Sequence, residues 1–113
     1  MIATVITKHR TFPELDTLLK RIEFVYHPVD VLLYGSRARG ESNANSDWDL
    51  MVVLPDESSE DLLDPMLGWE VQVNSGVHAD VLCCFESDFI AGMNVANTMP
   101  REIVDHAVSV IPR

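Results

Sequence analysis

Basic residues are missing from the central half of this sequence. No lysine or arginine occurs between Gly40 and Pro100, although acidic residues are frequent there, and the 113-residue chain carries a net charge of −10 at pH 7. Proteins that bind DNA or RNA directly neutralise phosphates with clustered lysine and arginine side chains. The sequence therefore argues against direct nucleic acid binding unless another subunit supplies the basic surface. Divalent cations and basic protein surfaces fit its charge better.

Cysteines and long apolar runs are also scarce. Cys83 and Cys84 are sequence neighbours, which predicts neither a disulfide framework nor a four-ligand zinc site but buried structural thiols on opposite faces of a strand. No apolar stretch approaches the roughly 20 residues of a membrane helix, and no signal peptide is apparent. We expect a cytoplasmic protein with no membrane association and one domain over residues 1–113, in which residues 1–10 form a peripheral extension.

Hydrophobic periodicity divides the chain into alternating helices and strands. Apolar residues at helical spacing predict a helix over residues 11–27 with Thr11 as its N-cap, and Pro28 ends it. A second helical pattern covers residues 57–73, where Pro65 and Gly68 must bend or break it. The remaining predictions are strands at 29–35, 47–55 and 78–85, a loop or short helix at 36–46, and two short helices with an edge strand within 86–113.

One segment, "GSRARGESNANSDWDL" (residues 35–50), concentrates glycine, arginine and aspartate directly after an aliphatic run. It is not a P-loop, because Glu41 stands where the phosphate-binding lysine would be. It is not an EF-hand, because apolar residues follow Asp49 where further oxygen ligands are required. The segment is therefore either a phosphate-handling site or a polar loop between two strands.

The carboxylates of this segment favour a site. Asp47 and Asp49 stand two residues apart at the entrance to a strand, so their side chains share a face while Trp48 faces the other side. Adjacent carboxylates repel each other, and a divalent cation such as Mg²⁺ relieves the repulsion. Asp80 begins the next aliphatic strand. If the two strands pair, three carboxylates meet at one end of the sheet and can hold two metal ions.

Gly35 and Ser36 supply the complement to these acids. A glycine at the tip of a strand allows close backbone approach, and the Ser36 hydroxyl and the following amides can donate to phosphate oxygens. Arg37 and Arg39 either add positive charge for a nucleotide or form a salt bridge that holds the loop. Both interpretations of the arginines stay open at this point.

These residues resemble a known family. Gly35-Ser36, a ten-residue gap, Asp47-x-Asp49 and the later Asp80 are similar to the nucleotidyltransferase superfamily related to DNA polymerase beta. More closely, "GSRARG" followed by "SDWDL" resembles the minimal nucleotidyltransferases, over roughly residues 14–111. The resemblance implies an α+β fold with a small mixed sheet of three to four strands and helices packed mainly on one face.

The resemblance also implies a role for each matching residue. The acids would coordinate two Mg²⁺ ions, with Asp80 completing the catalytic metal site and helping to deprotonate the acceptor hydroxyl, and ATP is the expected donor. His78 is expected to be a surface or supporting histidine. The candidate residues are Gly35, Ser36, Arg37 and Arg39 for the nucleotide, and Asp47, Asp49 and Asp80 for metal binding and catalysis.

A partner protein is implied as well. Minimal nucleotidyltransferases lack the helical domain that holds the acceptor, and they are commonly paired with a separate HEPN helical protein, which an antitoxin can modify with AMP. We expect this chain to lack an acceptor domain too. Three hypotheses follow: an adenylyltransferase antitoxin acting on a protein, a small-molecule nucleotidyltransferase of the aminoglycoside-modifying kind working as an oligomer or with a helper subunit, and a module that inhibits its partner by contact alone.

Overall fold

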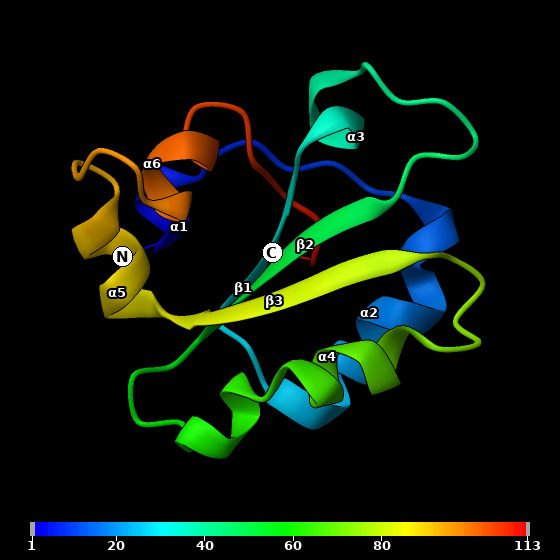
Figure 1. The fold of residues 1–113 in the computed structure, drawn as a ribbon, viewed down its shortest axis with the longest axis horizontal. Coiled ribbons are helices and arrows are strands. Elements are labelled where there is room, and N and C mark those ends of the chain that lie inside the picture. The colour runs from blue at the N-terminus through cyan, green and yellow to red at the C-terminus, as the bar shows by residue number, and fades with distance from the viewer. Residues whose placement is uncertain (1, 113) are drawn as a thin grey trace.

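A mixed four-stranded sheet forms the centre of the molecule (Figure 1). The computed structural model describes residues 2–112. Strand β1 (Asp30–Tyr34) is antiparallel to β2 (Trp48–Leu54) and to β4 (Val108–Ser109), whereas β2 and β3 (Ala79–Phe85) are parallel. The α+β class and the mixed sheet of the sequence prediction are confirmed. In spatial order the strands are β3, β2, β1 and β4.

Helices lie on both faces of this sheet. The two longest, α2 (Asp16–Tyr26) and α4 (Pro65–Gln72), pack on one face over the larger hydrophobic cluster. Three shorter helices supply buried side chains to the second cluster on the opposite face: α1 (Ile2–Val5), α5 (Glu86–Gly92) and α6 (Met99–Ile103). The predicted packing on one face therefore holds for the two longest helices, while the three shorter helices cover the other face.

The first predicted helix begins later than its sequence suggests. Thr11 does not cap it: a 3₁₀ turn, η1 (Pro13–Leu15), precedes α2, and Phe12 occupies the cap position without a side-chain hydrogen bond. The helix ends as predicted before Pro28, with His27 in the left-handed conformation at φ 46°. Leu18 and Ile22 of α2 are fully buried, so helical periodicity gave the correct inward face.

The second predicted helix is divided at Pro65. A 3₁₀ turn, η2 (Glu60–Leu63), comes first, and α4 then begins at Pro65 with Asp64 as its cap, whose carboxylate accepts the Met66 N–H at 2.9 Å. Gly68 does not break the helix, which continues through it to Gln72. It lies inside α4, where a Cβ atom would overlap the Val81 carbonyl oxygen of β3. Close packing on the sheet, rather than helix termination, accounts for this glycine.

The N-terminal segment is integrated with the sheet. Ile2 and Ile6 are only 2% exposed in the second cluster, and His9 forms a parallel bridge with Ser109 of β4. The Ser109 N–H donates to the Lys8 carbonyl at 2.8 Å. The peripheral extension predicted for residues 1–10 thus corresponds, over residues 2–10, to apolar cover for the sheet and a partner for its short edge strand.

The two cysteines follow the alternation of β3. Cys83 packs against the larger cluster and Cys84 against the second, on opposite faces as predicted, although both are half-buried rather than fully buried. Burial raises the pKa of both thiols, that of Cys84 to about 12, so they are protonated and unreactive at neutral pH. Among residues 2–112, no helix combines the length and the apolar character needed to cross a membrane.

Candidate active site

Two of the predicted acids lie side by side on neighbouring strands. Asp49 on β2 is paired in register with Asp80 on β3, and on its other side with Tyr34 at the end of β1. Residues opposite each other in a sheet point to the same face, so these three side chains form a row across one end of the sheet. The parallel pairing of β2 and β3 on which the sequence argument depended is confirmed.

The electrostatics of this row show that its carboxylates interact. Asp49 is partly buried, and burial, Asp80 and Asp47, in that order, raise its pKa, against an opposing effect of Arg39. Asp47 stands one residue before β2 and is exposed. Burial, with Asp49 and Asp80, also raises the pKa of Tyr34 to about 12, so its phenol is neutral. The site therefore has an excess of negative charge that a cation would relieve.

Gly35 brings the backbone of the preceding turn onto the same acids. It follows β1 with φ 76° and ψ −157°, a conformation essentially restricted to glycine, and a Cβ atom added to it would overlap Asp49 Oδ2. Its carbonyl oxygen accepts the N–H groups of Ala38 and Arg39, both at 3.1 Å, which begins the short helix α3 (Ser36–Arg39). The Gly35-Ser36 turn and Asp49 are thus in direct contact.

Comparison with known proteins identifies this arrangement. The profile of the nucleotidyltransferase domain matches residues 15–109, which include the turn, all three acids and the whole sheet. The chain belongs to the nucleotidyltransferase domain family. The resemblance drawn from the residues is confirmed, and the protein is a nucleotidyltransferase.

Two solved structures share the fold of this nucleotidyltransferase. A protein of Sulfolobus solfataricus described as a candidate nucleotidyltransferase is 14% identical, with 85% of this chain and 80% of that chain aligned at a TM-score of 0.51. A toxin-antitoxin structure with AMP-PNP is 18% identical, with 90% of this chain and 75% of that chain aligned at a TM-score of 0.54. These likenesses concern the fold alone. No curated protein matches the sequence significantly.

The two arginines of the nucleotidyltransferase motif do different things. Arg37 donates to the Ser46 carbonyl at 2.8 and 3.1 Å and to the Asn43 carbonyl at 3.3 Å, and its guanidinium stacks 4.1 Å from the centre of the Trp48 ring. Of the two interpretations from sequence, loop-holding is the one that fits Arg37, although its partners are carbonyls and not an acid. Arg39 is half-exposed, pairs with Glu41 at 2.7 Å, and is the basic residue that acts on the Asp49 pKa.

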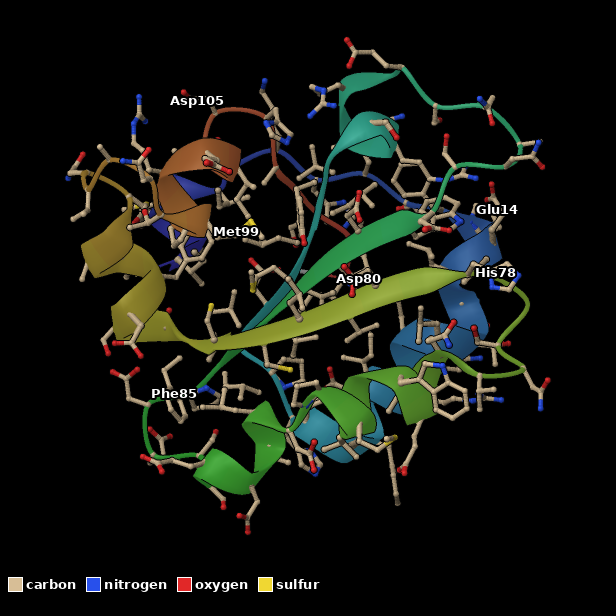
Figure 2. All side chains as sticks on the ribbon, viewed as in Figure 1. Glu14, His78, Asp80, Phe85, Met99 and Asp105 are labelled. Atoms are coloured by element: carbon tan, nitrogen blue, oxygen red, sulfur yellow. The ribbon has the colours of Figure 1, made fainter. Side chains whose placement is uncertain are left out.

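Two clefts adjoin the acids of the nucleotidyltransferase. One of about 220 Å³ is lined by Asp47, His78, Asp80 and Gln72. The other, of about 440 Å³, lies between Glu14, His78 and the loop that carries Asp47. Figure 2 shows Glu14 and His78 near the same end of β3 as Asp80. The exposed His78 side chain thus borders both clefts.

Two residues near the site carried no signal in the sequence. Tyr34 could only have been found from the strand register that sets it beside Asp49. His106, whose ring Nε2 accepts the Gly35 N–H at 3.1 Å, lies 71 residues away along the chain. No local motif marks a contact of this separation.

A cation at this site would need ligands from the substrate as well as from the protein. Within residues 2–112, no three histidine, cysteine, aspartate or glutamate side chains are gathered closely enough to form a metal centre by themselves. Asp49 and Asp80, adjacent in register, offer carboxylate oxygens from two strands. Mg²⁺ is commonly bound by one or two carboxylates and completes its shell with water and substrate phosphates. The residues present fit that mode of binding.

Proposed function

We propose that this nucleotidyltransferase uses a Mg²⁺-bound nucleoside triphosphate, with ATP as the expected donor, to transfer a nucleoside monophosphate to a hydroxyl group of a partner protein. The observation that carries the proposal is the contact of the Gly35-Ser36 turn with Asp49, which is itself paired with Asp80. Backbone donors and carboxylates meet there at one end of the sheet. A triphosphate and the cations that neutralise it need both.

The Gly35-Ser36 turn would hold the triphosphate. The backbone amides of Ser36 and Arg37 donate to no atom of residues 2–112 and are available to phosphate oxygens, as is the Ser36 hydroxyl. Arg39 adds a positive charge next to the acids, provided that its exposed pairing with Glu41 gives way. Arg37 would act indirectly by holding the loop between the two halves of the motif.

The carboxylates would hold Mg²⁺ and orient the reacting groups. When bound, Mg²⁺ neutralises charge on the phosphates and on the departing pyrophosphate. The acceptor oxygen forms a bond to the α-phosphorus while the bond from that phosphorus to the bridging oxygen breaks, and pyrophosphate leaves. Asp80, exposed on the edge strand, would receive the proton of the acceptor hydroxyl.

A protein acceptor is favoured by the access to the site. Asp80 lies on an edge strand and is exposed, and the adjoining cleft of about 220 Å³ is small and polar in its lining residues. The structural neighbour described as a toxin-antitoxin with AMP-PNP aligns with 90% of this chain. Together with the resemblance to minimal nucleotidyltransferases, this supports an HEPN-type helical protein as the acceptor and an antitoxin role.

The test is transfer of label from α-³²P-ATP in the presence of Mg²⁺ to the protein product of the adjacent gene. We expect the label on a tyrosine of that protein, no label with Asp49→Asn, and full labelling with Asp61→Asn, which removes the same charge from the exposed turn η2. Label on a small hydroxyl compound such as an aminoglycoside instead would show the small-molecule enzyme. Neutralisation of the partner without any transfer would show inhibition by contact, and either result would contradict the proposal.

A further inference from the structure

His106 connects the C-terminal part of the chain to the Gly35-Ser36 turn. It lies between α6 and β4, where its own N–H and that of Ala107 both donate to the Ile103 carbonyl, at 3.1 and 2.9 Å. Strand β4 follows two residues later and pairs with β1, and Gly35 is the residue that directly follows β1. The ring of His106 is therefore held at the end of β1, and its Nε2 accepts the Gly35 N–H at 3.1 Å.

This hydrogen bond completes the restraints on the Gly35 peptide groups. The carbonyl of Gly35 is occupied by two N–H groups of α3, and its N–H is occupied by His106. With both polar groups engaged and its Cα against Asp49, the turn has one orientation relative to the acids. Loss of the His106 bond would leave the Gly35 N–H without a partner and allow the Tyr34–Gly35 peptide to rotate.

We propose that His106 is a positioning residue for the nucleotide, and that its neutral ring holds the Gly35-Ser36 turn in the orientation that the triphosphate requires. The inference rests on the proposed triphosphate site at that turn. His106 acts through Gly35 and not on the reacting atoms. Because an amide N–H only donates, Nε2 must be unprotonated, so the neutral ring carries its proton on Nδ1.

Burial, supported by Arg39, favours the neutral form of His106. Burial and then Arg39 lower its pKa, while Asp105 and Glu41 raise it to a smaller extent, and the net change is downward. A protonated ring has an N–H on both nitrogens and cannot accept from Gly35. The bond is therefore present at neutral pH and is lost as the pH falls through the pKa of His106, which lies below the usual histidine value.

Two substitutions separate the hydrogen bond from the bulk of the side chain. His106→Gln keeps an acceptor at a position similar to Nε2 but does not titrate, whereas His106→Leu keeps the size and removes the acceptor. We expect the dissociation constant of Mg²⁺-AMP-PNP at pH 7.5 to change less than about twofold in the glutamine variant and to rise about tenfold in the leucine variant. Thermal unfolding of each variant verifies that it is folded.

The pH dependence gives a readout that a purely structural role would not produce. In the wild-type protein, the ¹H–¹⁵N signal of the Gly35 amide should shift between pH 7.5 and pH 5 in step with His106, and nucleotide affinity should fall with it. In His106→Gln, both changes should be absent apart from any acid effect on the carboxylates, which the two proteins share. Equal nucleotide affinity in the wild type and in a folded His106→Leu would overturn the inference while leaving the proposed function intact. No nucleotide binding by the wild type at any pH would overturn both.

Discussion

Gly35 meets two requirements that a side chain would violate together. Its φ of 76° is strained for any residue with a Cβ, and the space that a Cβ would occupy is already filled by Asp49 Oδ2. Gly40 shares only the first requirement, because its φ is 74° but a Cβ atom added there would have no neighbouring atom within 4 Å. A comparison of Gly35 with Gly40 therefore distinguishes the effect of backbone conformation from the effect of contact with Asp49.

Substitution of each glycine by alanine should therefore have different consequences. Gly40→Ala should lower the free energy of unfolding by about 1 to 2 kcal/mol, because of the left-handed conformation alone, and keep transfer activity. Gly35, at φ 76° and ψ −157°, lies outside the αL region in a conformation essentially restricted to glycine, so Gly35→Ala is strained too. It also displaces Asp49, so we expect at least about a 100-fold loss of transfer activity. Chemical denaturation and label transfer measure the two effects. Comparable activity in both variants would show that the contact with Asp49 is unimportant.

Asp49 should lower the free energy of unfolding of the protein at neutral pH, although the proposed activity requires it. Its pKa is raised in the folded protein, so folding disfavours its charged form, and this destabilisation is present at neutral pH and disappears as the pH falls below the ordinary aspartate range. Asp49→Asn should raise the melting temperature by about 2 to 5 °C and abolish transfer. Added Mg²⁺ should stabilise the wild type but not this variant. A lower melting temperature for Asp49→Asn would contradict this explanation of the Asp49 environment.

At the scale of elements, the sequence predicted the sheet better than its surroundings. Aliphatic runs located β1, β2 and β3, and placing Asp49 and Asp80 at strand entrances correctly predicted their pairing. Predictions failed where a long-range contact decides: Gly68 fits against Val81 of β3, and residues 8–10 pair with Ser109. Neither contact leaves a local pattern, because propensity and periodicity describe only neighbours along the chain.

Gly68 provides the test at this scale. Alanine in the middle of a helix is ordinarily about 1 kcal/mol more favourable than glycine. Here the added methyl group would overlap the Val81 carbonyl, so Gly68→Ala should instead destabilise the protein by about 1 to 3 kcal/mol. Thr17→Ala, on the exposed side of α2, is the matched helical control and should be neutral or slightly stabilising. Urea unfolding compares them, and a stabilising Gly68→Ala would refute the packing explanation.

At the scale of the whole molecule, the proposed site has to bind an anionic triphosphate on an acidic protein. The net charge of −10 opposes binding of a free triphosphate, yet the turn, Arg39 and two carboxylate-bearing strands converge at one end of the sheet. The sequence predicted this convergence through residue spacing and family resemblance. It could not predict His106, since that contact depends on how β4 returns the chain to β1.

The central claim is that the nucleotide and Mg²⁺ share one site, made by the Gly35-Ser36 turn together with Asp49 and Asp80. Calorimetric titration with AMP-PNP, with and without Mg²⁺, tests it most directly because no acceptor is needed. We predict binding only when Mg²⁺ is present, loss of that binding in Asp49→Asn, and unchanged binding in Asp61→Asn. Binding that is independent of Mg²⁺, or equally strong in Asp49→Asn and the wild type, would contradict the claim.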